Sequence, residues 1–400
     1  MKKLRIFLNS LWGQTLVGAV VWQALMSVIG LIMHALLAPE LSRRIGYDPR
    51  VTLLSHTAIW DAEHYLNITQ FFYGPGSSDI SGAFWPLFPL IVRLVGALTL
   101  NQVSPLWVGL LVNTGMLWLT LMALLRIGER LLGKQARIWP LIMMMSAPTA
   151  FYFHLYYSEA TYAAIGFWAY EFALARKFRN AFVLIAVLGA ARLPFLLFLG
   201  LITLEFWRAN EWRLGQTLKH PEARWLLTTP AGFLAFGLWM KSQRNDFFYM
   251  FTVYSRGYWP WHKRHPNIVE TFGAALGDTY RCLFAMDETC ALPREELTSA
   301  ALPALSLIVI ALAGIFAFRL RGVFIPLGAM CAAAFIMFTL NSNVVSVHRY
   351  ALCVLPIYLV AGEFFRRRPE NLKFLAAWTM FGVMTQATLM LLAISQYFVG

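Results

Sequence analysis

The residues best suited to chemistry lie close together in the first quarter of the chain. The segment that begins at Trp60 reads Trp-Asp-Ala-Glu-His-Tyr. Asp61 is a candidate general base on a sugar hydroxyl, because aromatic neighbours such as Trp60 and Tyr65 offer a stacking surface and a desolvated setting in which a carboxylate is more basic. Glu63 and His64 are further candidates for contacting a sugar hydroxyl or assisting the base.

The same segment permits a simpler interpretation. A helix over 57–70 would place Trp60 and His64 on one stripe and Asp61 and Tyr65 on the adjoining one. Such a helix could lie at a membrane interface, with the aromatic rings at the head groups and the carboxylates in water. Residue types alone do not separate this interpretation from catalysis.

A metal site is the other alternative for this segment. Asp61, Glu63 and His64 supply three potential ligands within four residues, but helical spacing prevents all three from facing one point. We therefore assign no metal and keep a divalent ion held by Asp61 and His64 as the alternative.

Two further segments carry residues of the same kind. At Tyr157-Ser-Glu159 one apolar run ends and another begins, so Ser158 and Glu159 could serve only as an N-cap and a first-turn acid. From Tyr254 onward, aromatic and basic residues alternate and include Arg256 and Trp259. That pattern suits sugar stacking and binding of anionic groups, or an interfacial aromatic anchor.

The composition decides which class of protein must position these residues. Of the 400 residues, 59% are hydrophobic and 13% are charged, about half the charged share of roughly 25% in soluble proteins. Mean hydropathy is +0.59, and apolar runs long enough to cross a bilayer recur along the chain. These features exclude a soluble enzyme, a disordered chain and a fibrous repeat. They predict an all-α polytopic membrane protein, a single domain over 1–400 with about 10–12 transmembrane or half-membrane helices.

The distribution of charge predicts the orientation. The net charge is +13, and the basic residues cluster in short segments between apolar runs, as in cytoplasmic loops. We therefore expect contact with anionic lipid head groups and no nucleic acid as partner. Lys2, Lys3 and Arg5 precede an apolar run over 15–38, which we interpret as an uncleaved anchor with its N-terminus inside.

This orientation places 40–84 in a first outer loop that holds the candidate base. A second large outer loop covers 241–300, and within it Cys282 and Cys290 could form a disulfide. Further spans are predicted near 104–125, 137–153, 157–175, 225–240, 300–318, 322–340, 350–363 and 373–396.

Two segments do not fit a simple count of crossings. Residues 85–100 are short and contain two prolines, and 181–206 holds Arg192 and Pro194 at its centre. All basic segments lie inside only if 181–206 forms two short helices that meet near the outer face and 85–100 makes no simple crossing. The alternative is one miscounted span. If 181–206 forms two short helices, the outer face contains the loops 40–84 and 241–300. It also contains three polar turns, at 157–159, around Arg192 and at 341–349.

Several segments resemble a known family. Trp-Asp-Ala-Glu-His-Tyr-Leu at 60–66 and Ala-Phe-Trp-Pro-Leu-Phe-Pro-Leu at 83–90 closely resemble the first lumenal loop of the PIG-V family, the second mannosyltransferase of glycosylphosphatidylinositol synthesis. Tyr-Ser-Glu-Ala at 157–160 resembles that family's Tyr-Ser-Glu-Ser. His348-Arg349-Tyr350 with the later Leu-Pro resembles an Arg-Tyr…Pro stretch common to the wider GT-C superfamily.

The chain also departs from the family pattern. It has Phe72-Tyr73-Gly74 in place of Gly-Tyr, Trp85 in place of Phe, and Arg192-Leu-Pro in place of Arg-Ser-Asn. The resemblance identifies a divergent bacterial member and leaves the acceptor open.

The resemblance implies a GT-C fold and a transferase that uses a polyprenyl-phosphate-linked sugar, with mannose the expected sugar. The acceptor would be a lipid or glycan on the outer face of the bacterial plasma membrane, or on the lumenal face of the endoplasmic reticulum in a eukaryote. It also implies a catalytic Asp61 and substrate-binding side chains at Trp60, Glu63, His64, Tyr65, Tyr157, Glu159, Arg192, Arg256, Trp259, His348 and Arg349.

The residue types fit this chemistry. Arg192 and Arg349 would bind the donor phosphate, because a guanidinium binds phosphate oxygens in pairs and stays charged; the simpler alternative is that they extend to lipid head groups. One carboxylate, Asp61, suffices for an inverting transfer since the phosphate leaves as an anion. Two competing functions stay open: a transporter or scramblase of lipid-linked sugars, and a non-catalytic assembly subunit that would not need Asp61.

Overall fold

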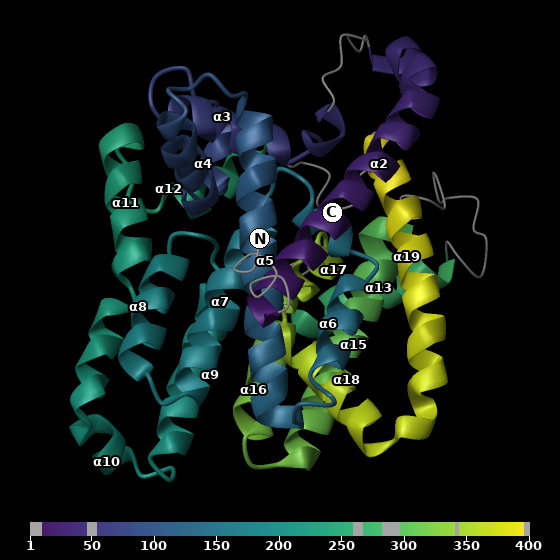
Figure 1. Ribbon diagram of the computed structural model, residues 1–400. Coiled ribbons are helices and arrows are strands. Elements are labelled where there is room, and N and C mark those ends of the chain that lie inside the picture. The colour runs from purple at the N-terminus through teal and green to yellow at the C-terminus, as the bar shows by residue number, and fades with distance from the viewer. Residues whose placement is uncertain (1–9, 46–53, 259–266, 282–296, 341–343, 396–400) are drawn as a thin grey trace.

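The structure is a computed structural model of the chain and describes residues 10–45, 54–258, 267–281, 297–340 and 344–395. Every regular element within these ranges is helical (Figure 1). The prediction of an all-helical protein is therefore confirmed. Trp259 and the predicted pair Cys282 and Cys290 lie outside the described residues.

Four helices are long and apolar enough to cross a membrane. They are α2 (Leu11–Ile45), α5 (Pro105–Leu132), α15 (Leu302–Leu320) and α19 (Leu372–Ile394). Large apolar side chains on them face outward, among them Leu312, which is 50% exposed, and Met384, which is 70% exposed. Contiguous exposed apolar surface of this kind suits lipid hydrocarbon better than water.

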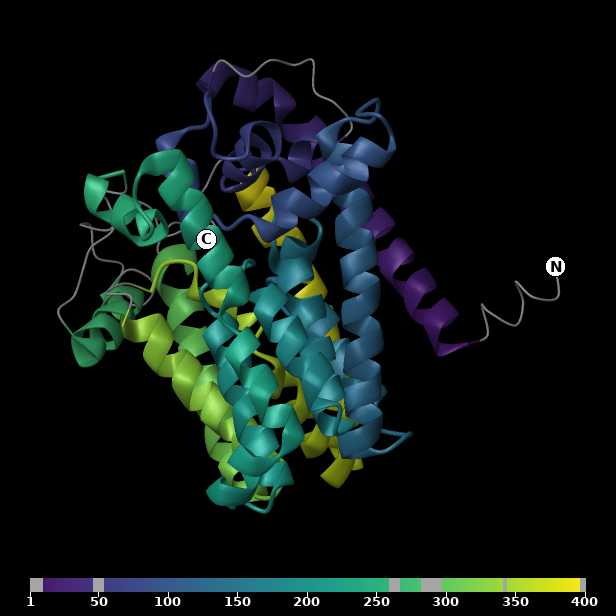
Figure 2. The same ribbon diagram turned by 90° about the vertical axis from the view of Figure 1, so that its left-hand side faces the viewer.

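The first predicted span is longer than expected. Helix α2 has 35 residues, or about 52 Å at about 1.5 Å per residue, and continues to Ile45, inside the predicted outer loop. Figure 2 shows α2, in purple, slanting along the outside of the bundle, where it packs against α5.

Three predicted spans are interrupted, and proline stands at or near each break. The segment 137–153 contains only the short helix α6 (Ile138–Met145), a proline-containing turn and a 3-10 turn, η3 (Ala150–Phe153). The segment 225–240 divides at Pro230 into a 3-10 helix, η4 (Pro221–Thr228), and α11 (Ala231–Arg244). The segment 350–363 divides into α17 (Val347–Ala351) and α18 (Leu355–Arg367), with Pro356 in the first turn of α18. Proline lacks an N–H and restricts the preceding residue, and hydropathy does not register either effect.

The two ambiguous segments fold as the charge distribution predicted. Residues 85–100 form α4 (Leu87–Leu98), whose 12 residues span about 18 Å and fall short of the roughly 20 residues that a crossing needs. Residues 181–206 form two helices, the end of α8 (Phe178–Leu188) and most of α9 (Phe195–Ala209), joined by a turn that holds Arg192.

The basic segments gather at one end of the molecule. In Figure 1 the turns α5–α6, α15–α16 and α18–α19 and the short α10 (Leu214–Lys219) lie at the lower end. Arg126 and Arg130 of α5 both pair there with Glu171, near the end of α7 (Glu159–Leu174). Helices α3 (Ala62–Phe71) and α12 (Tyr249–Thr252) lie at the upper end. The predicted separation of basic segments from the chemically suited residues is therefore present.

Helix α7 forms the centre of the bundle and positions the site. It packs against α5, α8 and α9, and most of its side chains are buried. Two glycines permit close approach in this region: a Cβ at Gly166 would lie 2.5 Å from the Phe198 ring of α9, and one at Gly109 of α5 would lie 2.3 Å from the Tyr156 ring just before α7. The first residue of this central helix is Glu159.

Candidate active site

Four charged side chains from distant parts of the sequence meet in one cluster. Arg349 of α17 donates from Nη1 to Oδ2 of Asp61 at 2.5 Å and from Nε to Oε1 of Glu159. Arg192, in the turn between α8 and α9, donates from Nη1 to the same Glu159 oxygen. The structure therefore brings together four of the residues that sequence analysis singled out.

The cluster is balanced in charge and unequal in burial. Two guanidiniums face two carboxylates, which removes the large penalty of an unpaired buried charge. The side chains of Glu159 and Arg349 are 0% and 2% exposed, whereas those of Arg192 and Asp61 are 12% and 26% exposed. Glu159 and Arg349 thus form the fixed interior of the cluster, and Asp61 is its most accessible member.

Aromatic rings support both arginines. The Arg349 guanidinium lies 4.5 Å from the ring centre of Tyr157 and 5.5 Å from that of Tyr152. The Arg192 guanidinium lies 4.9 Å from the ring centre of Tyr350. Cations over aromatic faces are stabilised electrostatically. Tyr152 and Tyr350 were not predicted as site residues. Two signals in the sequence could have identified them: the aromatic run at 151–157 and the position of Tyr350 directly after Arg349.

Backbone geometry presents Asp61 to the cluster. The predicted helix over 57–70 begins only at Ala62, and Asp61 stands at its N-cap. Trp60 has φ +55°, a left-handed conformation that is uncommon for a bulky residue and costs of order 1–3 kcal/mol. The hydroxyl of Tyr157 stabilises this turn, because it accepts from the Asp61 N–H at 3.2 Å and donates to the Ile59 carbonyl at 3.1 Å.

Trp60, Glu63 and His64 do not line the cavity beside Asp61. Trp60 donates from its indole Nε1 to the carbonyl of Ala393 in α19 at 3.3 Å, so it anchors the turn. Glu63 is exposed. His64 stacks on Phe84, with ring centres 4.6 Å apart, and its burial lowers the pKa of the imidazole. The helix begins only at Ala62, and this start directs the three side chains away from the cavity.

The predicted alternative of a metal held by Asp61 and His64 concerns the same region. Among the residues that the structure describes, no group of three His, Cys, Asp or Glu side chains is placed to hold a metal ion. In the structure Asp61 binds Arg349, and His64 packs against an aromatic ring.

Tyr65 and Ser158 connect the first loop to α7. The Tyr65 hydroxyl and Ser158 Oγ lie 2.8 Å apart and share a hydrogen bond, and burial raises the pKa of Tyr65 to about 12. Ser158 occupies the N-cap position of α7, as expected, but its side chain does not cap the helix. Tyr65 also faces the cavity, so its predicted place in the site is supported by geometry.

A cavity of about 440 Å³ opens beside the charged cluster. Binding pockets for small molecules typically measure about 300–1,000 Å³. The charged and polar part of the wall comes from Asp61, Arg192, Ser346 and Arg349. The rest is aromatic or apolar and includes Phe84, Trp85, Leu193, Pro194, Met250, Phe251, Tyr254, Met337, Phe338, Leu340, Val345, Val347 and Tyr350. One cavity therefore combines a carboxylate, two guanidiniums and an extensive apolar surface.

The second predicted loop contributes Tyr254 to the cavity wall, a residue that was not among the predicted site residues. Tyr254 lines the cavity, whereas Arg256 is exposed and lies over the ring of Tyr249, 4.6 Å from its centre. His348 is buried and is not part of the cavity wall, although its neighbour Arg349 is. Alternation along a sequence does not show which side chain faces inward, and Arg256 lies outside the wall of this cavity.

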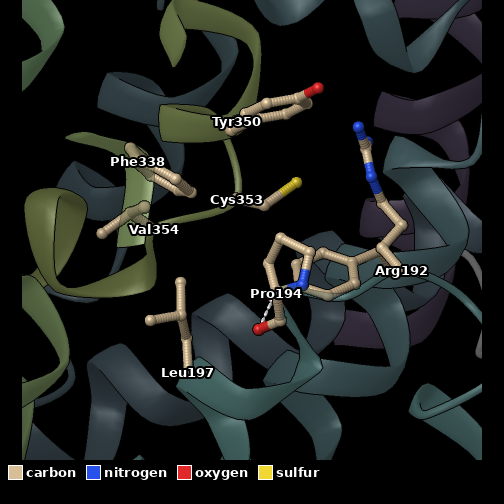
Figure 3. Close-up of a pocket in the computed structure, with 8 residues that line it drawn as sticks. Arg192, Pro194, Leu197, Phe338, Tyr350, Cys353 and Val354 are labelled. Atoms are coloured by element: carbon tan, nitrogen blue, oxygen red, sulfur yellow. Dashed lines mark hydrogen bonds between the residues drawn. The ribbon is translucent and has the colours of Figure 1, made fainter. Parts of the chain in front are cut away.

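A smaller hollow adjoins the cavity and is drawn in Figure 3. It shares Arg192, Pro194, Phe338 and Tyr350 with the larger space, and the Cys353 thiol points into it. Its volume is about 10 Å³, close to the minimum that holds a single water molecule. The hydroxyl of Tyr162 closes one side by donating to the Pro194 carbonyl at 2.7 Å.

Comparison with known proteins does not assign this site to a family. No family model matches the chain, and no curated protein matches it significantly. The resemblance to the PIG-V family and the GT-C superfamily therefore stays a prediction, resting on the short motifs that carry it.

Proposed function

We propose that this protein is an integral membrane glycosyltransferase of the GT-C type. It transfers a sugar, with mannose the first candidate, from a polyprenyl-phosphate donor to a lipid or glycan acceptor. The site lies on the extracytoplasmic side, at the end of the molecule opposite the basic turns. The four long apolar helices support the membrane location, and the short motifs support the family.

One observation carries the proposal: Asp61, Arg192 and Arg349 face a single cavity whose other walls are largely apolar. Two guanidiniums suit a phosphate, which they bind through paired hydrogen bonds. The apolar walls suit the first isoprene units of the lipid carrier. A carboxylate in the same cavity suits the activation of an acceptor hydroxyl.

The reaction then follows as a single displacement. Asp61 takes the proton of the acceptor hydroxyl while the acceptor oxygen bonds to the anomeric carbon. The bond from that carbon to the phosphate oxygen breaks, and its electron pair leaves with the lipid phosphate. Arg192 and Arg349 stabilise the negative charge that develops there. Attack opposite the leaving group inverts the anomeric configuration, and no second carboxylate is required.

Two other functions remain as outcomes of the test. A transporter or scramblase would bind and move the lipid-linked sugar without breaking its glycosidic bond. A non-catalytic subunit would tolerate loss of the Asp61 carboxylate. Both differ from the proposed transferase in whether sugar is transferred and whether transfer depends on Asp61.

The first prediction is that Asp61→Asn abolishes transfer. The purified protein in detergent is incubated with radiolabelled polyprenyl-phosphate-mannose and a membrane lipid extract, and label in new products is measured. A general base contributes about 100- to 10,000-fold, so the variant should lose at least about 100-fold. Asp79→Asn is the matched control, because Asp79 also pairs with an arginine, Arg244 at 2.7 Å, outside the cavity wall. Equal activity of the wild type and Asp61→Asn would reject Asp61 as the base.

A further inference from the structure

In the charged cluster, Asp61 is bound to the guanidinium of Arg349, which a donor phosphate would also need as a hydrogen-bond donor. Arg349 uses Nη1 to bind Asp61 and Nε to bind Glu159. We infer that Asp61 and the donor phosphate compete for Arg349, so that arrival of the phosphate releases the Asp61 carboxylate to act as the base. This inference rests on the proposed function and adds an order of events to it.

The burial of the partners decides which one moves. Arg349 is 2% exposed, is held by Glu159 and lies against the ring of Tyr157. Asp61 is 26% exposed, stands at a helix N-cap, and receives no hydrogen bond to its other carboxylate oxygen from the described part of the chain. Exchange therefore proceeds by rotation of the Asp61 side chain away from a fixed guanidinium.

The charge balance of the cluster favours the same exchange. In the structure, two guanidiniums face the carboxylates of Glu159 and Asp61. A bound phosphodiester adds a negative charge within a few ångströms of Asp61, where like charges repel. Transfer of the acceptor proton then neutralises Asp61 while the leaving phosphate gains a second negative charge, which the two guanidiniums stabilise. The Arg349–Asp61 ion pair thus holds the base until donor arrives, and the site that contains donor holds it ready to accept a proton.

The test is a binding measurement that does not require turnover. The protein is reconstituted in nanodiscs of phosphatidylcholine, and binding of farnesyl phosphate is measured by calorimetry for the wild type, Asp61→Asn and the Asp79→Asn control. Removing the competing carboxylate should tighten binding about three- to tenfold, or about 0.7–1.4 kcal/mol. Asp79→Asn should stay within about twofold of the wild type. Farnesol, which lacks the phosphate, should bind all three equally, which also shows that the variants are folded.

Each result has a definite meaning. If Asp61→Asn binds farnesyl phosphate as tightly as the wild type or more weakly, the competition is overturned. The competition is also overturned if neither the wild type nor Asp61→Asn binds farnesyl phosphate. Tightening of farnesol by the same factor also overturns it, since the phosphate would then not be responsible. Tighter phosphate binding without any sugar transfer by the wild type supports the competition and rejects the proposed function. Sugar transfer by the wild type with unchanged binding of farnesyl phosphate by Asp61→Asn rejects the competition and supports the proposed function.

Discussion

Two arginines interrupt apolar stretches of the sequence, and their side chains have different surroundings. Arg93 of α4 donates from Nη1 to the carbonyl oxygens of Thr69 and Gln70, at 2.8 and 3.0 Å, and so closes the end of α3. Arg192 binds Glu159 and faces the cavity. The first is placed to support structure and the second to contact a substrate, a distinction that residue type does not reveal.

Lysine substitutions should separate these roles. Arg192→Lys keeps the charge but loses paired recognition of phosphate, so we expect kcat/KM for sugar transfer to fall about 10- to 100-fold. Arg93→Lys should change kcat/KM less than about threefold while lowering the free energy of unfolding by about 0.5–1.5 kcal/mol, because an ammonium does not reach both carbonyl oxygens with the geometry of the guanidinium. Steady-state kinetics and thermal unfolding in detergent measure both effects. Similar kinetics for the two variants would contradict the assignment of Arg192.

At the scale of elements, the packing of α19 depends on close backbone approach. A Cβ at Gly382 would lie 1.8 Å from the carbonyl oxygen of Ser146, at the end of α6. Gln386, one turn later, donates to the Met145 carbonyl at 2.9 Å. A backbone atom cannot rotate aside as a side chain can, so this contact fixes the position of α19.

We therefore expect Gly382→Ala to destabilise the fold by about 1–3 kcal/mol through overpacking. Gly18→Ala in α2 is the matched control, because no heavy atom lies within 4 Å of its added Cβ. The control should be neutral or stabilising by about 0.5–1 kcal/mol, since alanine favours a helix over glycine. Thermal unfolding in detergent compares the two, and equal midpoints would show that α19 does not pack as described.

A buried histidine pair joins the turn before α7 to the first helix. Nε2 of His56 and Nε2 of His154 lie 3.0 Å apart, and Nδ1 of His154 contacts Oε1 of Gln23 in α2 at 2.6 Å. Burial, together with the neighbouring His56, lowers the pKa of His154 from 6.5 to about 3. The folded protein thus keeps this imidazole neutral where an unfolded chain would protonate it.

Acid should consequently destabilise the protein. Above about pH 6.5 both states hold His154 neutral; as the pH falls below that value, only the unfolded state gains the proton. The free energy of unfolding should then fall by up to about 1.4 kcal/mol per pH unit from this group until the pH nears 3. His154→Gln should reduce the slope between pH 7.5 and 4.5, and His220→Gln, at the opposite end, should retain it. An unchanged slope in His154→Gln would assign the acid sensitivity to other groups.

At the scale of the whole molecule, the two ends differ in charge and in chemistry. The basic turns lie at one end, and α3, α12 and the turn between α4 and α5 lie at the other (Figure 1). Basic loops remain in the cytoplasm, so the cavity end should face outward.

Labelling of introduced cysteines tests this orientation. In a protein with Cys282 and Cys290 changed to serine, Gln102→Cys should react with a membrane-impermeant maleimide in intact cells. Arg321→Cys should react only after permeabilisation. Both positions are exposed, and Cys331 and Cys353 are buried, so background labelling should be low. The reverse pattern would place the site on the cytoplasmic side.

Sequence alone determined the properties that depend on local composition. Long apolar runs predicted the helices α5, α15, α16 (Phe324–Leu340) and α19, and the basic segments predicted that 181–206 would be two helices. Asp61 was selected because its residue type and its aromatic neighbours match a chemical task. These inferences hold because hydrophobicity, charge and ionisable groups are properties of residues before any folding occurs.

Only the tertiary structure decided which residues meet. Asp61 and Arg349 are 288 positions apart in sequence, and no periodicity relates them. Tyr254 lines the cavity whereas Arg256 does not, and the start of α3 at Ala62 turns Glu63 away from it. Such outcomes depend on where proline-broken helices end and how closely glycines let them pack. They are decided by the sum of many long-range contacts, which a local pattern of residues does not contain.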